Sequence, residues 1–176
     1  MKEAIPPNVP KPSNKEVYLR IFVDSDHSGD KLTKRSRTGY IIFLNNAPVA
    51  WFSNKQATIE TSVFGVEFVA MKIGMETLQG LGYKLCIMGV PILVSSFIYG
   101  YNMSIIHKTQ WPESTLKKNS NSICYHAIRV SVEMKESLTG HVPSVDNPED
   151  ICMKVVPGVS KWKHLIGKVL HDLYDQ

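Results

Sequence analysis

The hydrophobic pattern of this chain changes its period once, near residue 62, and that change most restricts the possible folds. Before it come three runs rich in β-branched and aromatic residues, the last two joined by the tight-turn pair Asn45-Asn46: residues 16–24, 38–44 and 47–53. Such runs, bounded by polar turns, are typical of strands. They predict three consecutive antiparallel strands at the start of the fold.

From Ser62 onward the apolar residues recur at helical spacing along two stripes, which predicts a helix that is buried on more than one side. Thr61 or Ser62 can cap its start, and Gly80 and Gly82 predict its end. Strands and helices then alternate, with strands expected at 95–100 and 138–142 and helices at 102–109, 122–137 and 160–174. This order predicts an α/β protein with a five-stranded mixed sheet and flanking helices.

Length and composition agree with a single domain. The 176 residues, 43% of them hydrophobic, suffice for one core, and residues 1–16 contain four prolines among polar neighbours. We therefore expect a linker or extended arm over 1–16 and the domain over 17–176. The net charge of +4 permits nucleic-acid binding without demonstrating it.

The cellular compartment is predicted from the cysteines, the start of the chain and its most apolar stretch. The three cysteines lie far apart and form no Cys-x-x-Cys pair, which favours reduced thiols over disulfides or a zinc site. The start of the chain does not resemble a signal peptide, and the most apolar stretch, 85–98, is too short to span a bilayer. We expect an intracellular protein, cytoplasmic or nuclear, without a membrane partner.

Three carboxylates occupy positions where a negative charge is costly unless it binds a metal. Asp24 ends an apolar strand, Glu67 lies within the apolar helix, and Asp150 opens an apolar segment. The loop from Asp24 to Asp30 also resembles a calcium loop, but position 12 of that pattern holds Arg35 in place of the bidentate glutamate. For Asp26 and Asp30 the simpler interpretation is that they cap backbone amides in a turn.

A series of motifs resembles the ribonuclease H domain of copia-type retrotransposon Pol polyproteins. That family has a D-x-D-x-x-G-D loop, an R-S-x-x-G-Y strand, and later E-Y-x-A, I-Y-x-D-N, Y-H-x-I-R and V-P-x-x-x-x-x-A-D-I. The matching segments keep this order: 24–30, 35–40, 67–70, 98–102, 125–129 and 142–151. The resemblance covers about residues 18 to 156, and the arm at 1–16 would then be the end of the connection from the reverse transcriptase domain of the same polyprotein.

The resemblance implies a two-metal nuclease that cleaves RNA in RNA–DNA hybrids, with Mg2+, or Mn2+ in its place, as cofactor. By this analogy Asp24 bridges both ions, Asp150 completes one metal site, and Glu67 with residue 101 completes the other. Position 101 departs from the pattern, because it holds Tyr101 where the family has aspartate. A phenol is neutral near pH 7 and is a poor magnesium ligand, so we expect impaired catalysis.

Two interpretations of function follow. One is a ribonuclease H with weakened activity, and the other is a catalytically dead retroelement remnant or nucleic-acid-binding pseudoenzyme. Lys34, Arg35 and Arg37 lie beside the predicted site and can contact phosphates of a hybrid, although a solvated basic loop explains them equally well. The sequence does not indicate an oligomeric state.

Overall fold

In the described part of the chain, five strands form one mixed sheet in the order β3-β2-β1-β4-β5. This computed structural model describes residues 16–30, 32–92, 95–111, 122–153 and 158–170. The strands are β1 (Leu19–Asp26), β2 (Arg37–Leu44), β3 (Ala47–Lys55), β4 (Ser96–Gly100) and β5 (Ser137–His141). The first three are antiparallel, whereas β4 runs parallel to both β1 and β5. The predicted mixed sheet with an antiparallel start is confirmed.

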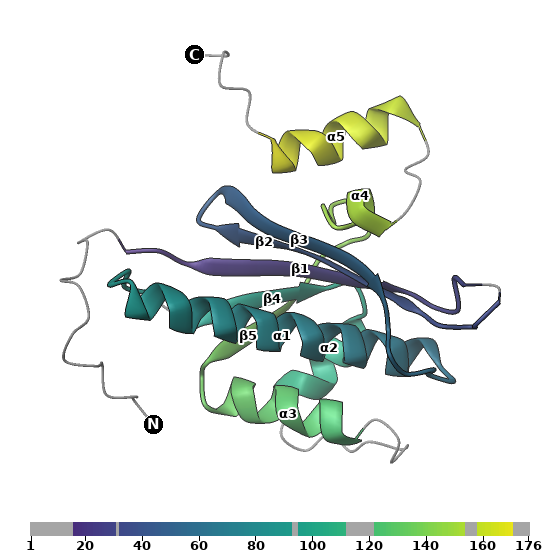
Figure 1. The fold of residues 1–176 in the computed structure, drawn as a ribbon, viewed down its shortest axis with the longest axis horizontal. Coiled ribbons are helices and arrows are strands. Elements are labelled where there is room, and N and C mark those ends of the chain that lie inside the picture. Colours follow the sequence, from purple (N-terminus) through teal and green to yellow (C-terminus); the bar gives the residue numbers. More distant parts are fainter. Residues whose placement is uncertain (1–15, 31, 93–94, 112–121, 154–157, 171–176) are drawn as a thin grey trace.

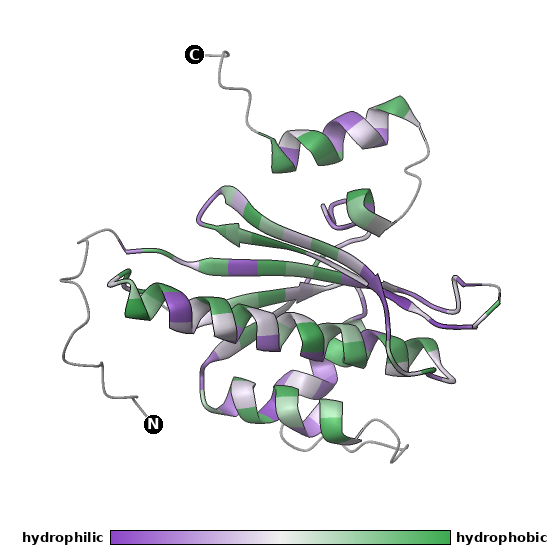
Figure 2. Cartoon of the chain, viewed as in Figure 1, coloured by the Kyte–Doolittle hydropathy of each residue, from purple (hydrophilic) through white to green (hydrophobic). Residues whose placement is uncertain are grey.

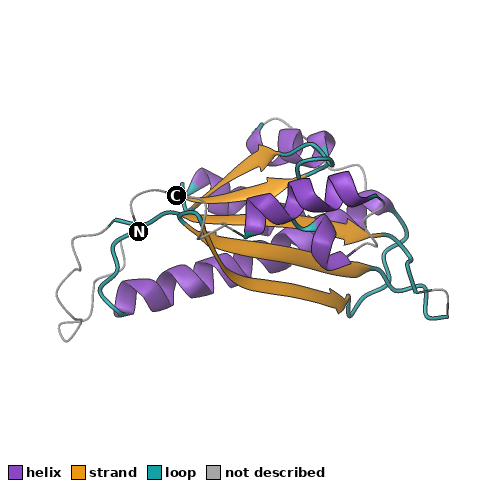
Figure 3. Ribbon diagram, turned by 90° about the horizontal axis from the view of Figure 1, so that it is seen from above, coloured by secondary structure: helices purple, strands orange, loops and turns teal. Residues whose placement is uncertain are grey.

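Helices cover both faces of the sheet (Figures 1 and 3). On one face lie α1 (Val63–Ile87), α2 (Met103–Gln110) and α3 (Ser122–Glu133). On the other face, α4 (Asp150–Met153) contacts β1, β2 and β3, and α5 (Val159–Val169) packs beyond it against α4. Among the described residues, no helix combines the length and apolar character needed to cross a bilayer.

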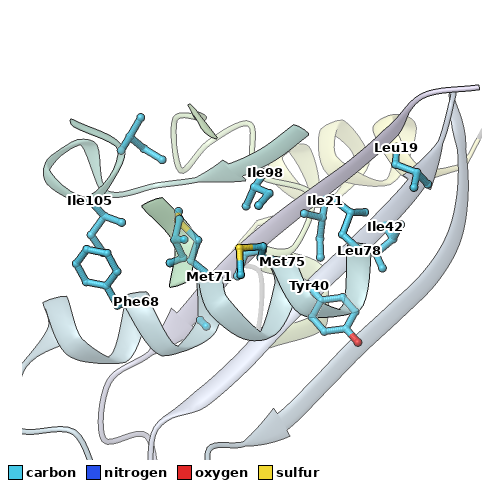
Figure 4. Close-up of a cluster of buried hydrophobic side chains, with 14 of the residues drawn as sticks. Leu19, Ile21, Tyr40, Ile42, Phe68, Met71, Met75, Leu78, Ile98 and Ile105 are labelled. Carbon is cyan, nitrogen blue, oxygen red and sulfur yellow. The ribbon is translucent and has the colours of Figure 1, made fainter. Parts of the chain in front are cut away.

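The core lies between α1 and the sheet (Figure 4). Alternate residues of β1, namely Leu19, Ile21 and Val23, point to α1 and are almost fully buried. The helix supplies a row of buried side chains against them: Phe68, Met71, Met75 and Leu78. Figure 2 shows hydrophobic residues along the central strands and more polar ones in the loop that follows β1. Alternate residues of β1 and residues three or four positions apart on α1 therefore pack into one core.

The start of α1 agrees with the prediction, but its end does not. The Ser62 side chain caps the helix by accepting a hydrogen bond from Gly65 N–H, 3.2 Å away. The expected end at Gly80 and Gly82 is wrong, because α1 continues to Ile87. A Cβ on Gly82 would lie 3.2 Å from Ile92 Cδ1, so this glycine permits close packing instead of ending the helix.

Gly89 is the residue that ends α1. Its φ of 76° lies in the left-handed region, and Val90 N–H donates to the Leu85 carbonyl at 2.9 Å. This pattern is the hydrogen-bonded glycine cap common after helices.

Within α1, Gly74 allows a close approach to the sheet, since a Cβ there would lie only 2.8 Å from Val23 Cγ2. The helix axis is thereby held close to β1.

The remaining boundaries differ by a few residues. The helix expected over 122–137 ends at Glu133, because Lys135 has φ of 58° and Glu136 N–H returns to the Ser131 carbonyl. The helix expected over 160–174 is observed as α5, and residues 171–176 lie outside the described part. The arm expected over 1–16 also lies outside it, apart from Glu16.

Candidate metal and nucleic-acid site

The parallel pairing of β1 with β4 ends at Val23 and Gly100, and this junction positions the first predicted site residue. Asp24 of β1 and Tyr101, the residue after β4, come next. Asp24 points to the same face as Phe22 and is 9% exposed, whereas Tyr101 is 51% exposed, with its ring 6.4 Å from that of His141. The strand register thus places residue 101 beside Asp24.

A pocket at this junction contains Asp24, Glu67 and Tyr101 in its lining. Glu67 reaches it from the second turn of α1 and is half-buried. Asn102 also lines the pocket, and its side chain caps α2 by accepting a hydrogen bond from Ser104 N–H at 2.9 Å. Two strand ends and two helix starts therefore surround one concave site.

On its other side Asp24 approaches two carboxylates that open α4. Oxygen atoms of Asp24, Glu149 and Asp150 all lie within 4.8 Å of one another, and Glu149 and Asp150 are 0% and 2% exposed. The backbone before α4 is fixed by Asn147, whose side chain accepts a hydrogen bond from Glu149 N–H at 3.2 Å. Asp150 N–H donates to the Asn147 carbonyl. This turn directs both acidic residues to the end of β1.

Asp24 is thus the residue that joins two groups. We call Asp24, Glu67 and Tyr101 the pocket half, and Asp24, Glu149 and Asp150 the α4 half. The predicted site residues Asp24, Glu67 and Asp150, far apart in sequence, lie in these two halves. Their roles as metal ligands stay predictions.

Glu149 was missed by sequence reasoning. Its only signal is that it directly precedes Asp150, where the A-D-I motif has alanine. A single residue in a turn has no periodicity that reveals burial. Only the packing of α4 against β1, β2 and β3 shows that this glutamate is enclosed.

The α4 half also has a cationic neighbour from α5. Lys161 Nζ lies 2.9 Å from Asp150 Oδ2. His164 and Lys168 lie on the same face of α5 and pair with Asp146 at 3.1 and 2.5 Å. Hydrogen bonds from Lys168 and His164 hold the pKa of Asp146 below its ordinary value. Together with the fully buried Leu165, these contacts fix α5 over the segment that carries Glu149 and Asp150.

The donor set of the α4 half fits a hard divalent cation. All three side chains are carboxylates, which Mg2+ and Mn2+ prefer over nitrogen or sulfur. Ligand oxygens about 2.1 Å from one octahedral Mg2+ lie roughly 3–4 Å from each other. A group of oxygens within 4.8 Å has about the size that one ion gathers.

Two of the three predicted basic residues line a second, polar pocket beyond the end of β1. It contains Arg35 and Arg37 together with Lys55 of β3, which sequence reasoning did not include. Lys34 is exposed in the same loop. Lys55 Nζ lies 2.5 Å from Asp30 Oδ2. The lysine and the hydrogen bond from Thr33 Oγ1 hold the pKa of Asp30 well below its usual range.

Asp30 behaves as its simpler interpretation predicts. Asp30 accepts a hydrogen bond from Leu32 N–H at 3.0 Å and so caps its own turn. Asp26 folds over the same loop, because its Oδ2 lies 1.8 Å from the place where a Gly29 Cβ would be. A side chain at position 29 would collide with this carboxylate. Asp26 is therefore committed to the loop and does not line the pocket that contains Tyr101.

Sequence comparisons match this chain to a segment of much longer proteins. No family model matches it. It is 26% identical over 136 residues to the retrovirus-related Pol polyprotein from transposon RE1 of Arabidopsis thaliana, covering 77% of this chain and 9% of that protein. It is 24% identical over 139 residues to the retrovirus-related Pol polyprotein from transposon TNT 1-94 of Nicotiana tabacum. That match covers 79% of this chain and 10% of that protein. The chain spans about a tenth of the length of the curated relatives it matches.

Structural comparisons give the fold. The N-terminal ribonuclease H domain of rv2228c from Mycobacterium tuberculosis matches with a TM-score of 0.57 and 12% identity, over 77% of this chain and 90% of that one. LC11-RNase H1 in complex with an RNA/DNA hybrid matches with a TM-score of 0.56 and 18% identity, over 73% of this chain and 88% of that one. At these identities the likeness concerns the fold, which is that of ribonuclease H.

Proposed function

We propose that this chain, a ribonuclease H-like domain whose homologues are retrovirus-related Pol polyproteins from copia-type transposons, binds RNA–DNA hybrids and cleaves their RNA strand with impaired efficiency. The observation that carries the proposal is the position of Asp24, shared between the pocket half and the α4 half. Acidic residues from β1, α1 and α4 gather around one strand end, as metal-dependent phosphoryl chemistry requires.

Asp24, Glu67 and Asp150 are the residues that would hold divalent metal. Bound Mg2+ supplies charge that stabilises the attacking and leaving oxygens of a phosphodiester displacement. Asp24 and Asp150 are buried, and this exclusion of water strengthens their attraction to a cation. Glu67 approaches from α1, where the close packing at Gly74 keeps the helix near β1.

Tyr101 is the reason for the proposed impairment. It occupies the strand-end position beside Asp24 and brings a neutral phenol to the pocket that also contains Glu67. Its half-exposed ring offers no carboxylate, and Asp26 is turned to its own loop. The pocket half therefore has one negative charge fewer than the family motif, which has an aspartate at position 101.

Hybrid binding is proposed to use the polar pocket after β1. Arg35, Arg37 and Lys55 gather there. Arg35 lies in the loop that follows the end of β1 at Asp26, and Arg37 is the first residue of β2. Cationic side chains next to a metal site can hold phosphates on either side of the reacting one. Recognition would then depend on backbone shape and 2′-hydroxyls instead of base edges. The reverse transcriptase domain of the same polyprotein is the partner proposed to deliver the hybrid.

The test is cleavage and binding of a labelled RNA–DNA hybrid with Mg2+ or Mn2+. We expect slow cleavage by the native chain, none by Asp24→Asn, and hybrid binding by both. Glu133→Gln, at the end of α3, is a control for loss of an acidic residue outside the two halves, and it should cleave like the native chain. Binding without any cleavage would favour the pseudoenzyme alternative. Absence of both, with a normal folded structure, would leave a remnant without activity and contradict the proposal.

A further inference from the structure

We propose that Glu149 completes a divalent-cation site with Asp24 and Asp150, and that Lys161 competes with the cation for Asp150. This inference rests on the proposed function, because it concerns the metal chemistry of the same site. It adds a ligand that the family pattern does not contain and a cationic side chain that regulates access to the site.

The first step is the charge of the α4 half. Three carboxylates lie within 4.8 Å of one another and all are buried. Like charges at this separation, away from water, repel strongly unless a cation lies between or beside them. A positive partner therefore stabilises such a group.

The second step is that the chain brings a cation to this place. Lys161 Nζ contacts Asp150 Oδ2 at 2.9 Å, and the side chain of Asp150 is only 3% exposed. This ion pair shows that a positive group reaches the edge of the acidic cluster. A lysine ammonium carries a single positive charge. A divalent ion can contact all three carboxylates at once.

The third step is the placement of Glu149. A glutamate with no exposed surface is unusual in a short turn, and Asn147 pins its backbone so that it cannot easily swing out. Its carboxylate joins the two aspartates on the side away from Tyr101. The chain has therefore lost a carboxylate in the pocket half and carries an additional one in the α4 half.

The fourth step is that Lys161 can leave without dismantling α5. Its side chain is 31% exposed, so water is within reach of the ammonium group. The helix keeps its other attachments, which are the pairing of His164 and Lys168 with Asp146 and the burial of Leu165. A divalent ion can then replace the Lys161 ammonium group at Asp150 through a movement of the lysine side chain alone, while α5 stays in place.

The experiment measures Mn2+ binding by calorimetry, and melting temperature in chelator and in saturating Mn2+. Glu149→Gln should weaken Mn2+ binding at least about tenfold, because loss of even an outer-shell partner of a metal ligand costs about 10–100-fold. Lys161→Met should lower the melting temperature in chelator, but should tighten Mn2+ binding and keep the native melting temperature in Mn2+. Glu133→Gln and Lys163→Met are matched controls, because Glu133 lies on α3 and Lys163 is exposed on α5. Both should bind Mn2+ like the native chain.

The outcomes separate this inference from the proposed function. Native Mn2+ affinity in Glu149→Gln, with loss in Asp24→Asn, overturns the role of Glu149 and leaves the proposed function intact. An equal drop in melting temperature for Lys161→Met with and without Mn2+ means that Lys161 is only structural, which also overturns the competition. If the native chain binds no Mn2+ at all and does not cleave hybrids, the proposed function itself fails. Should Glu149→Gln not fold, Glu149→Ala, with the residue of the family motif, provides the same comparison.

Discussion

The two halves that share Asp24 differ in exposure, in charge and in structural support. The pocket half combines a half-buried glutamate with an exposed tyrosine, whereas the α4 half consists of buried carboxylates. A helix with a cationic face covers the α4 half. The comparison teaches that one aspartate can lie between a more exposed, less acidic group and a more acidic, better enclosed one.

Replacing Tyr101 with aspartate is the strongest way to remove this difference. Tyr101→Asp should raise hybrid cleavage about 10–100-fold, the range associated with restoring support to a metal ligand set. Tyr83→Asp is a suitable control, because Tyr83 is similarly exposed but lies near the far end of α1 from Glu67. The measurement is single-turnover cleavage of a labelled hybrid in Mg2+. An unchanged rate, with an intact fold, would mean that the weakness of the pocket half has another cause.

A second prediction ranks the halves by metal affinity. Asp150→Asn should weaken Mn2+ binding by about tenfold or more, because it removes a buried carboxylate from the proposed metal site. Glu67→Gln should have the smaller effect, since its half already lacks a carboxylate at position 101. Calorimetric titration of both variants gives the order directly. A larger loss in Glu67→Gln would reverse the comparison and place the dominant ion in the pocket half.

The third prediction concerns the basic loop, which serves both halves. Replacing Lys34, Arg35 and Arg37 with alanine should lower the slope of log affinity against log salt by about 2 to 3, because each phosphate contact contributes about 0.9. Hybrid affinity measured by fluorescence anisotropy at several salt concentrations provides the test. Replacing Lys84, Lys135 and Lys163 instead removes the same charge outside the polar pocket. An equal slope for the two triple variants would assign binding to net charge alone.

The sequence predicted the pocket half better than the α4 half, for physical reasons. Asp24 follows an alternating strand and Glu67 lies in a periodic helix, so both positions follow from local patterns. The parallel alignment of β1 and β4 then brings residue 101 beside Asp24. Glu149 and Lys161 belong to a turn and a surface helix, whose contacts depend on tertiary packing that no local period records.

The misplaced end of α1 has the same explanation. Glycine has a low helix propensity and is common just after the end of a helix, which is why Gly80 and Gly82 predict an end there. Gly82 instead lies where the helix passes close to Ile92 and Leu19, a contact between segments distant in sequence. The glycine that does end the helix, Gly89, is identified by its positive φ and the hydrogen bond that follows it.

The smallest expected effect tests how α5 is held over the α4 half. Asp146 has its pKa lowered by Lys168 and His164, so its ionised form stabilises the folded state. That contribution is present above the unfolded pKa of about 3.9 and is lost as pH falls through the lower folded value. Asp146→Asn should therefore slightly reduce the melting temperature near neutral pH and flatten its decline below about pH 4. Because the pair is exposed to solvent, the difference should also shrink in high salt. A melting profile that declines with acid as steeply as that of the native chain would show that Asp146 does not secure α5. The support of the α4 half would then come from Leu165 and from Lys161 itself.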